Sequence, residues 1–249
     1  FIVAVFAIAA NSLNAQNYYD SSGDLINEVQ DKDSINNIFI YEVGYTFSPY
    51  SFNQTRLIFD ASNYIFEDID EVIAARTANL HSFFLGTKGY LGASRKTVVY
   101  FGANLHTSQQ LNFLNVEISA GRSWMLTPFD NQYFRFNTQL GINLNTVGYN
   151  LENNPNDAGI SQRNLSAISS IELQIPIYKK LCFFVRGTAA LPFYTWKQIS
   201  FPIEETTEGT RFQAFNPKDN ADILTIEPNG NRLFNSFFFF TTGISFSFK

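Results

Sequence analysis

Strict alternation of apolar and polar residues is the dominant pattern along this chain. The segment 132–146 shows it most clearly, because Phe134 and Ile142 belong to an apolar set that alternates with polar residues such as Asn137. Alternate side chains of a strand point to opposite faces, so the pattern predicts a strand with one apolar and one polar face. The same reasoning predicts strands over 39–47, 54–66, 78–91, 97–105, 112–123, 132–146, 165–177, 181–193 and 233–248.

Many of these strands exceed the roughly 5–6 residues of an ordinary soluble strand. Strands of about 9–11 residues cross a bilayer, with apolar side chains facing lipid and polar ones facing the lumen. We therefore predict an all-β fold, a single antiparallel up-and-down transmembrane β-barrel. Its lipid face would carry Phe134, Ile171 and Val185, and Phe237 and Phe239 would point inward. A secreted β-sandwich, which also has alternating strands, is the alternative.

The number of strands is open at this level. Nine segments are predicted, whereas single-chain bacterial barrels have an even number. Either a further strand precedes residue 36, or one weak segment between 54 and 91 lies outside the barrel. Ten strands fit the length best, with eight as the fallback.

The lengths of the connections predict the direction of the barrel, because periplasmic turns are short and extracellular loops long. The short connections are 92–96, 127–131 and 178–180, and the predicted outer ones are 67–76, 148–163 and 197–232. Within the longest, 199–201 and 223–226 are apolar and could pair as a hairpin that binds a partner or caps the lumen. The alternative is a solvated loop that only closes the barrel.

The two ends of the sequence indicate export. Residues 1–10 are apolar, too few for a spanning helix of about 20 residues, and small residues follow up to Ala15 and Gln16. This predicts a signal peptide over 1–16 that lacks its charged start. Residues 17–35 would form a periplasmic segment or a missed strand, and 36–249 the barrel.

The last predicted strand carries Phe246 and Phe248 just before the final residue. A terminal aromatic residue resembles the C-terminal signal of bacterial outer-membrane β-barrels. Together with the strand pattern, the chain resembles the small outer-membrane barrel proteins of Gram-negative bacteria, in particular those of Bacteroidota. The resemblance implies a location in the outer membrane, lipid contact and recognition of the last strand by the barrel-assembly machinery.

Charged residues on the inward parity come from successive predicted strands and alternate in sign. They form a predicted lumen charge ladder of Glu117, Arg135, Glu172 and Arg186. Because buried charge is tolerated when it is paired, we expect Glu172 to pair with Arg135 or Arg186. Such a ladder would plug a small barrel, or act as a gate or selectivity site for a small polar solute.

Aromatic residues near the strand ends predict an interfacial girdle. They are Trp124, Tyr133, Tyr178, Tyr194 and Trp196.

Little in the sequence indicates catalysis or the binding of nucleic acid, metal or cofactor. The net charge of −5 argues against nucleic acid as a partner, and no metal or cofactor motif is present. The two histidines, His81 and His106, have no spacing that specifies a catalytic triad. We expect a non-enzymatic barrel whose outer loops bind or scaffold a partner. The alternatives are a narrow channel or transporter, an accessory subunit of a larger complex, and a membrane-embedded hydrolase or acyltransferase.

Overall fold

The computed structural model of the chain describes residues 38–64, 67–91, 96–129, 132–151, 158–178, 181–206, 209–227 and 232–247. The predicted signal peptide, the segment 17–35 and Phe248 lie outside the described residues. Within the described ranges the regular structure consists of strands, and no apolar helix of membrane-spanning length occurs.

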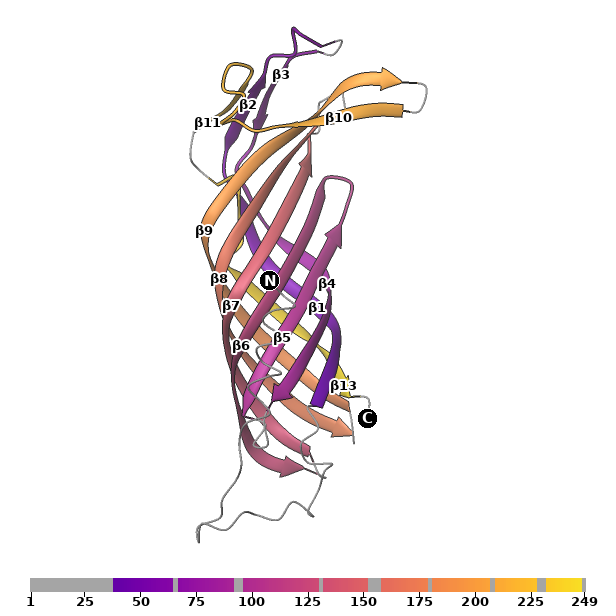
Figure 1. Ribbon diagram of the computed structural model, residues 1–249, viewed down its shortest axis with the longest axis vertical. Coiled ribbons are helices and arrows are strands. Elements are labelled where there is room, and N and C mark those ends of the chain that lie inside the picture. The colour runs from indigo at the N-terminus through magenta and orange to yellow at the C-terminus, as the bar shows by residue number, and fades with distance from the viewer. Residues whose placement is uncertain are drawn as a thin grey trace, which may run out of the picture.

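Eight antiparallel strands form a closed, hydrogen-bonded ring (Figure 1). In order around the ring they are β1 (Ile38–Phe52), β4 (Arg76–Leu91), β5 (Thr97–Thr107), β6 (Leu111–Phe129), β7 (Gln132–Asn150), β8 (Gly159–Tyr178), β9 (Leu181–Thr206) and β13 (Phe238–Ser247). β13 closes the ring by pairing with both β9 and β1, as in the register Val43 to Ile244. The predicted all-β, up-and-down architecture is confirmed as a barrel-like ring, and its strand count is the lower of the two considered.

Most of the remaining strands lie beyond one end of the ring, at the top of Figure 1. A three-stranded sheet has the order β11 (Leu224–Glu227), β2 (Thr55–Phe59), β3 (Ile69–Ile73). β9 continues past the ring to pair with β10 (Gly209–Phe215), and β12 (Phe234–Asn235) pairs with the end of β1. We call these outer strands and their connections the cap.

The cap corrects two predictions. The segment 54–66 is not a ring strand: β2 has five residues, and its apolar side chains Leu57 and Phe59 are buried in protein. The apolar pieces of the longest connection do not pair with each other either. Residues 199–201 pair with 213–215, whereas 224–227 pair with 56–59. Both pieces are buried in one apolar cluster, which stabilises them without mutual pairing.

The ring strands β7 and β8 also extend further toward the cap than predicted. Half of the expected outer loop 148–163 is strand, because β7 runs to Asn150 and β8 begins at Gly159, with 151–158 between them. At the other end, the short connections join directly paired residues, such as Phe129 to Gln132 and Tyr178 to Leu181.

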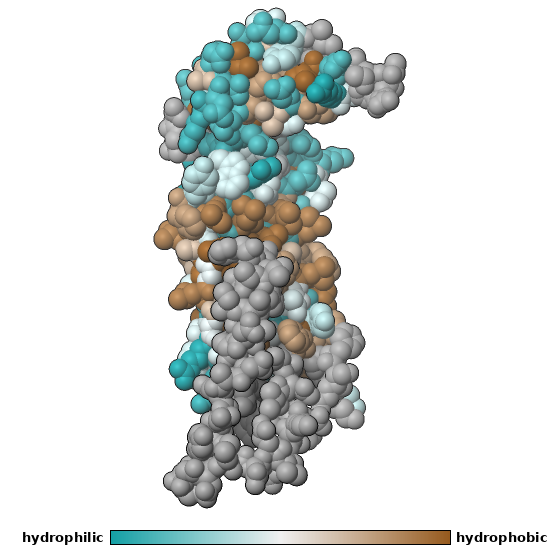
Figure 2. Space-filling model, in the orientation of Figure 1, coloured by the Kyte–Doolittle hydropathy of each residue, from teal (hydrophilic) through white to brown (hydrophobic). Residues whose placement is uncertain are grey.

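In the lower part of the ring the usual arrangement of a soluble protein is reversed. On β7, Asn137, Asn143 and Asn145 point inward and are buried, whereas Leu140 and Ile142 point outward and are exposed. Leu140 is 70% exposed. Other strands follow the same rule, and their outward apolar side chains form the brown band across the middle of Figure 2.

In the upper part the polarity inverts within the same strands. Further along β7, Val147 and Tyr149 point inward and are buried, whereas Asn150 is outward and exposed. β6 shows the same change, because Phe113 is buried and its neighbour Asn112 is exposed. The surface above the brown band in Figure 2 is accordingly mostly teal. Single strands therefore combine a segment whose apolar side chains point outward with a segment whose apolar side chains point inward.

At the start of the last predicted strand, the predicted inward and outward positions are also wrong. The predicted inward parity of Phe237 and Phe239 places Phe234 on the outward face, yet Phe234 is fully buried. Phe237, predicted to point inward, is 39% exposed. The parity changes because the strand is interrupted between β12, which ends at Asn235, and β13, which starts at Phe238. Phe239 points inward, as predicted.

Candidate functional site

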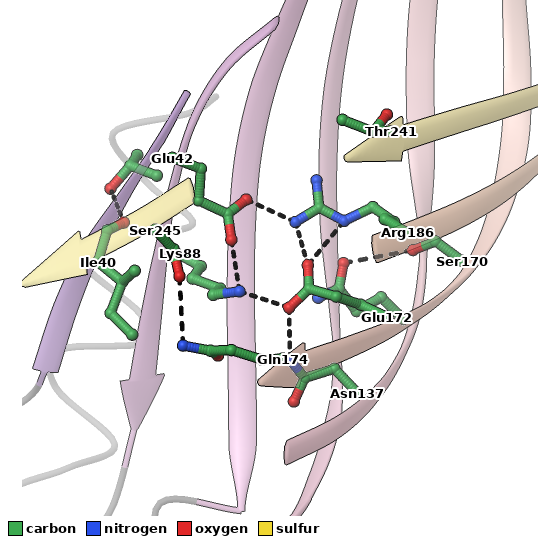
Figure 3. Close-up of polar contacts among 12 residues, drawn as sticks. Ile40, Glu42, Lys88, Asn137, Ser170, Glu172, Gln174, Arg186, Thr241 and Ser245 are labelled. Atoms are coloured by element: carbon green, nitrogen blue, oxygen red, sulfur yellow. Dashed lines mark hydrogen bonds and ion pairs between the residues drawn. The ribbon is translucent and has the colours of Figure 1, made fainter. Parts of the chain in front are cut away.

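Four charged side chains form a closed circuit of alternating sign inside the ring (Figure 3). The Nζ atom of Lys88 lies 2.5 Å from Oε1 of Glu42 and pairs with Glu172. The guanidinium of Arg186 lies 2.7 Å from Oε2 of Glu42, and its Nε donates to Oε2 of Glu172 at 2.8 Å. We call these four residues the ion network.

The ion network crosses the lumen rather than following the wall. Lys88 lies on β4 and Glu172 on β8, which are four strands apart in either direction around the eight-stranded ring. One layer below, Tyr90 on β4 donates a hydrogen bond to Gln174 on β8 at 2.7 Å. Side chains from diametrically opposite strands therefore meet across the interior at these two levels.

Two further buried charges accompany the network. Glu117 on β6 lies 3.8 Å from Nη1 of Arg186. Arg135 on β7 has its guanidinium 4.2 Å from the ring centroid of Tyr90 and donates to Ser123. The six buried charges of the described interior thus comprise three carboxylates and three cations. Balanced charge is what a low-dielectric interior tolerates.

Arg186 is held by aromatic rings as well as by carboxylates. Its guanidinium carbon lies 3.8 Å from the ring centroid of Tyr100 and about equally far, at 5.6 and 5.5 Å, from those of Phe84 and Phe184. Cation–π contact adds to the ion pairs when the cation is desolvated. Tyr100 fits because Gly102 has no side chain: a Cβ there would meet the Tyr100 hydroxyl at 1.8 Å.

Above the polar layers an apolar cluster fills the top of the ring and continues into the cap. The ring centroids of Phe113 and Phe234 are 6.2 Å apart, and those of Phe52 and Tyr149 5.3 Å apart. Phe201 and other cap residues belong to the same cluster. This upper cluster joins the cap to the ring.

The structure places all four residues of the predicted charge ladder in the interior, with an arrangement that differs from strand-by-strand pairing. Of the two proposed partners of Glu172, Arg186 makes the ion pairs, and Arg135 lies beside Gln174 in the register. Sequence reasoning missed Glu42 and Lys88. Glu42 shares the inward parity of Thr46, a signal that was available, whereas glycines on both sides of Lys88 obscure its parity.

The predicted girdle residues are distributed over both ends of the ring. Trp124 and Tyr178 lie near the lower end and are 40% and 63% exposed. Tyr194 and Trp196 lie toward the cap, with ring centroids 5.3 Å apart. The side chain of Tyr133 lies outside the described residues. Phe246, near the end of β13, stacks on Tyr41 of β1 with 6.1 Å between centroids.

The histidines are placed away from the ion network. His81 points outward, where it contacts the Tyr45 hydroxyl and the ring of Phe47. His106 donates from Nδ1 to the backbone carbonyl of His81 at 2.7 Å. Both contacts are structural pairings between neighbouring strands.

Comparison with known proteins adds no identification. The chain matches no protein-family model, and no curated protein matches it significantly in sequence.

Proposed function

We propose that this protein is an outer-membrane β-barrel whose interior is closed and whose cap is a binding or scaffolding surface. The observation that carries the proposal is the inversion of polarity within single strands. A soluble sheet gains nothing from exposing Leu140 and Ile142 while burying Asn143 and Asn145, whereas a lipid environment favours that arrangement. The upper segment, whose apolar side chains point inward, then stands outside the membrane.

The filled interior favours a structural barrel over a channel. The ion network and the upper cluster occupy successive levels of the lumen, and small barrels of about eight strands are filled by their own side chains. We therefore propose that the barrel is a non-enzymatic support with no cofactor, similar to small barrels of Gram-negative outer membranes. Recognition of β13 by the barrel-assembly machinery belongs to the same proposal.

The cap supports a role in binding because it is folded and acidic. Its strands share the upper cluster with the ring, so their positions are fixed relative to the barrel. The connections 53–75 and 197–232 together contain eleven Asp or Glu against five Lys or Arg, a net charge of −6. Like charge repels and opposite charge attracts a partner over a Debye length, so the surface favours a cationic partner.

Single-channel recording on the refolded protein in planar bilayers separates the scaffold from a channel. We expect no discrete conductance steps from the wild type. Reproducible, ion-selective steps would replace the scaffold by a narrow channel or transporter.

Co-purification from outer membranes tests the cap. Replacing 203–212 by a short Gly/Ser turn keeps Phe201 and Phe215 in the upper cluster, and we expect normal folding with loss of the bound partner. The matched control replaces Asn150 by Ala outside the cap. Equal recovery of partners by the shortened and full-length proteins would contradict the assignment of binding to the β9–β10 hairpin.

A further inference from the structure

Four buried polar side chains line one wall of the ring and keep polar atoms that have no hydrogen-bond partner among the described residues. The atoms are Nδ2 of Asn115, Nε2 of Gln139, Oδ1 of Asn143 and Oγ of Ser166. Each residue is at most 3% exposed. They come from β6, β7 and β8, which are consecutive in the ring.

The hydrogen bonds that these residues do make leave complementary atoms free. Nδ2 of Asn143 donates to Oδ1 of Asn115 at 2.9 Å, which leaves a donor on Asn115 and an acceptor on Asn143. Ser166 lies directly opposite Asn143 in the register, where side chains on one face are neighbours. Oε1 of Gln139 accepts from Ser119 at 2.9 Å, which leaves the Gln139 amide nitrogen as a donor.

The free atoms specify a small, neutral molecule that both donates and accepts hydrogen bonds. Two amide nitrogens, one carbonyl oxygen and one hydroxyl carry no formal charge. Buried polar groups in folded proteins almost always have a partner, and buried water typically makes about three hydrogen bonds to such groups. Gln139 and Asn143 lie four residues apart on β7, about 13 Å along the strand, so they belong to two separate places. We propose that Asn115, Asn143 and Ser166 form a hydration site that binds internal water, and that Gln139 binds a second water.

The position of this site predicts that its water exchanges slowly with bulk solvent. The inward residues of β6 follow the order Phe113, Asn115, Glu117. Phe113 belongs to the upper cluster and Glu117 contacts Arg186 of the ion network. The site at Asn115, Asn143 and Ser166 therefore lies between the upper cluster and the charged layer, whereas Gln139 lies beyond Glu117, opposite Gly121 and Ser170.

Water-to-protein NMR cross-relaxation in lipid nanodiscs tests the site, with water itself as the probe. We expect the side-chain amide protons of Asn115 and Gln139 to show cross peaks to long-lived water. The internal reference is Asn164, whose amide donates to Asn145 at 2.8 Å and should show a much weaker peak. Absence of water cross peaks at both Asn115 and Gln139 in the wild type would overturn the proposal.

Variants separate bound water from general interior hydration. Ser166→Ala removes a hydroxyl of the site and should weaken the Asn115 peak, and Asn143→Leu should abolish it. Ser245→Ala removes a buried hydroxyl elsewhere in the interior, one that already bonds to the Cys182 carbonyl, and should leave both peaks unchanged. If Asn143→Leu does not fold, Ser166→Ala decides. A Ser166→Ala protein with an undiminished Asn115 peak would contradict a site built from these residues.

Discussion

Lys88 and Glu172 form an ion pair across the full width of the ring, from β4 to the diametrically opposite β8. The same Glu172 also binds Arg186 of the neighbouring strand β9. One carboxylate thus links two sides of the lumen. Among the described residues, side chains of opposite strands therefore meet across the interior of the ring at this level.

Removing this carboxylate should be costly. Glu172→Gln leaves Glu42 as the only carboxylate that Lys88 and Arg186 share, with Glu117 3.8 Å from Arg186. Removing one partner of a buried ion pair costs roughly 3–5 kcal/mol. Denaturant unfolding in lipid vesicles measures the loss. The double variant Glu172→Gln, Lys88→Gln should recover part of the stability, because it also removes one of the two cations that have lost Glu172 as a partner.

The exposed pair of Arg56 and Asp70 in the cap is the matched control. Their atoms are 2.6 Å apart but solvated, so Asp70→Asn should change the unfolding free energy little. A Glu172→Gln protein as stable as the Asp70→Asn protein would show that the ion network does not stabilise the ring.

The fit of Tyr100 over Gly102 gives a second prediction. In Gly102→Ala the added Cβ would meet the Tyr100 hydroxyl, so the ring must shift away from Arg186. Overpacking of this kind costs about 1–3 kcal/mol. At Gly148 an added Cβ would have its nearest contact at 3.9 Å, so Gly148→Ala is the control and should be close to neutral. Equal thermal stability of both variants would refute the proposed role of this glycine.

The polarity of the outward face changes along β7. An added charge on this face should therefore cost a different amount of folding free energy at different positions. Leu140→Arg places a cation in the outward apolar band and should destabilise the lipid-folded state by about 2–4 kcal/mol. Asn150→Arg, on the same face of the same strand but above the inversion, should cost much less. Folding titrations into vesicles check both, and a similar cost at the two positions would place the boundary elsewhere.

Local sequence pattern was sufficient for the fold class because the period of two survives along the ring strands. It was insufficient for β2, since Leu57 and Phe59 alternate like lipid-facing residues yet enter a protein core. Alternation reports that one face is apolar, and it does not say whether lipid or protein covers that face. That ambiguity is why the count of strands remained open.

The sequence predicted that charged residues lie in the interior, but it did not predict which of them form ion pairs. Parity alone places Glu117, Arg135, Glu172 and Arg186 inside. The choice of Arg186 over Arg135 as partner, and the contact with Lys88, depend on which strands face each other after closure of the ring. The sequence of one strand does not show which strand lies opposite it in the closed ring. The contacts of the ion network therefore became visible only in the structure.

The central claim is that the lower ring spans a membrane and the upper ring stands in water. Spin labels placed one at a time at outward positions 140, 142, 144, 148 and 150 of β7, in reconstituted bilayers, test it most directly. Accessibility to dissolved oxygen should be high and to a water-soluble nickel reagent low at 140, 142 and 144. The preference should reverse at 148 and 150. Uniform access of the nickel reagent along all five positions would contradict the account.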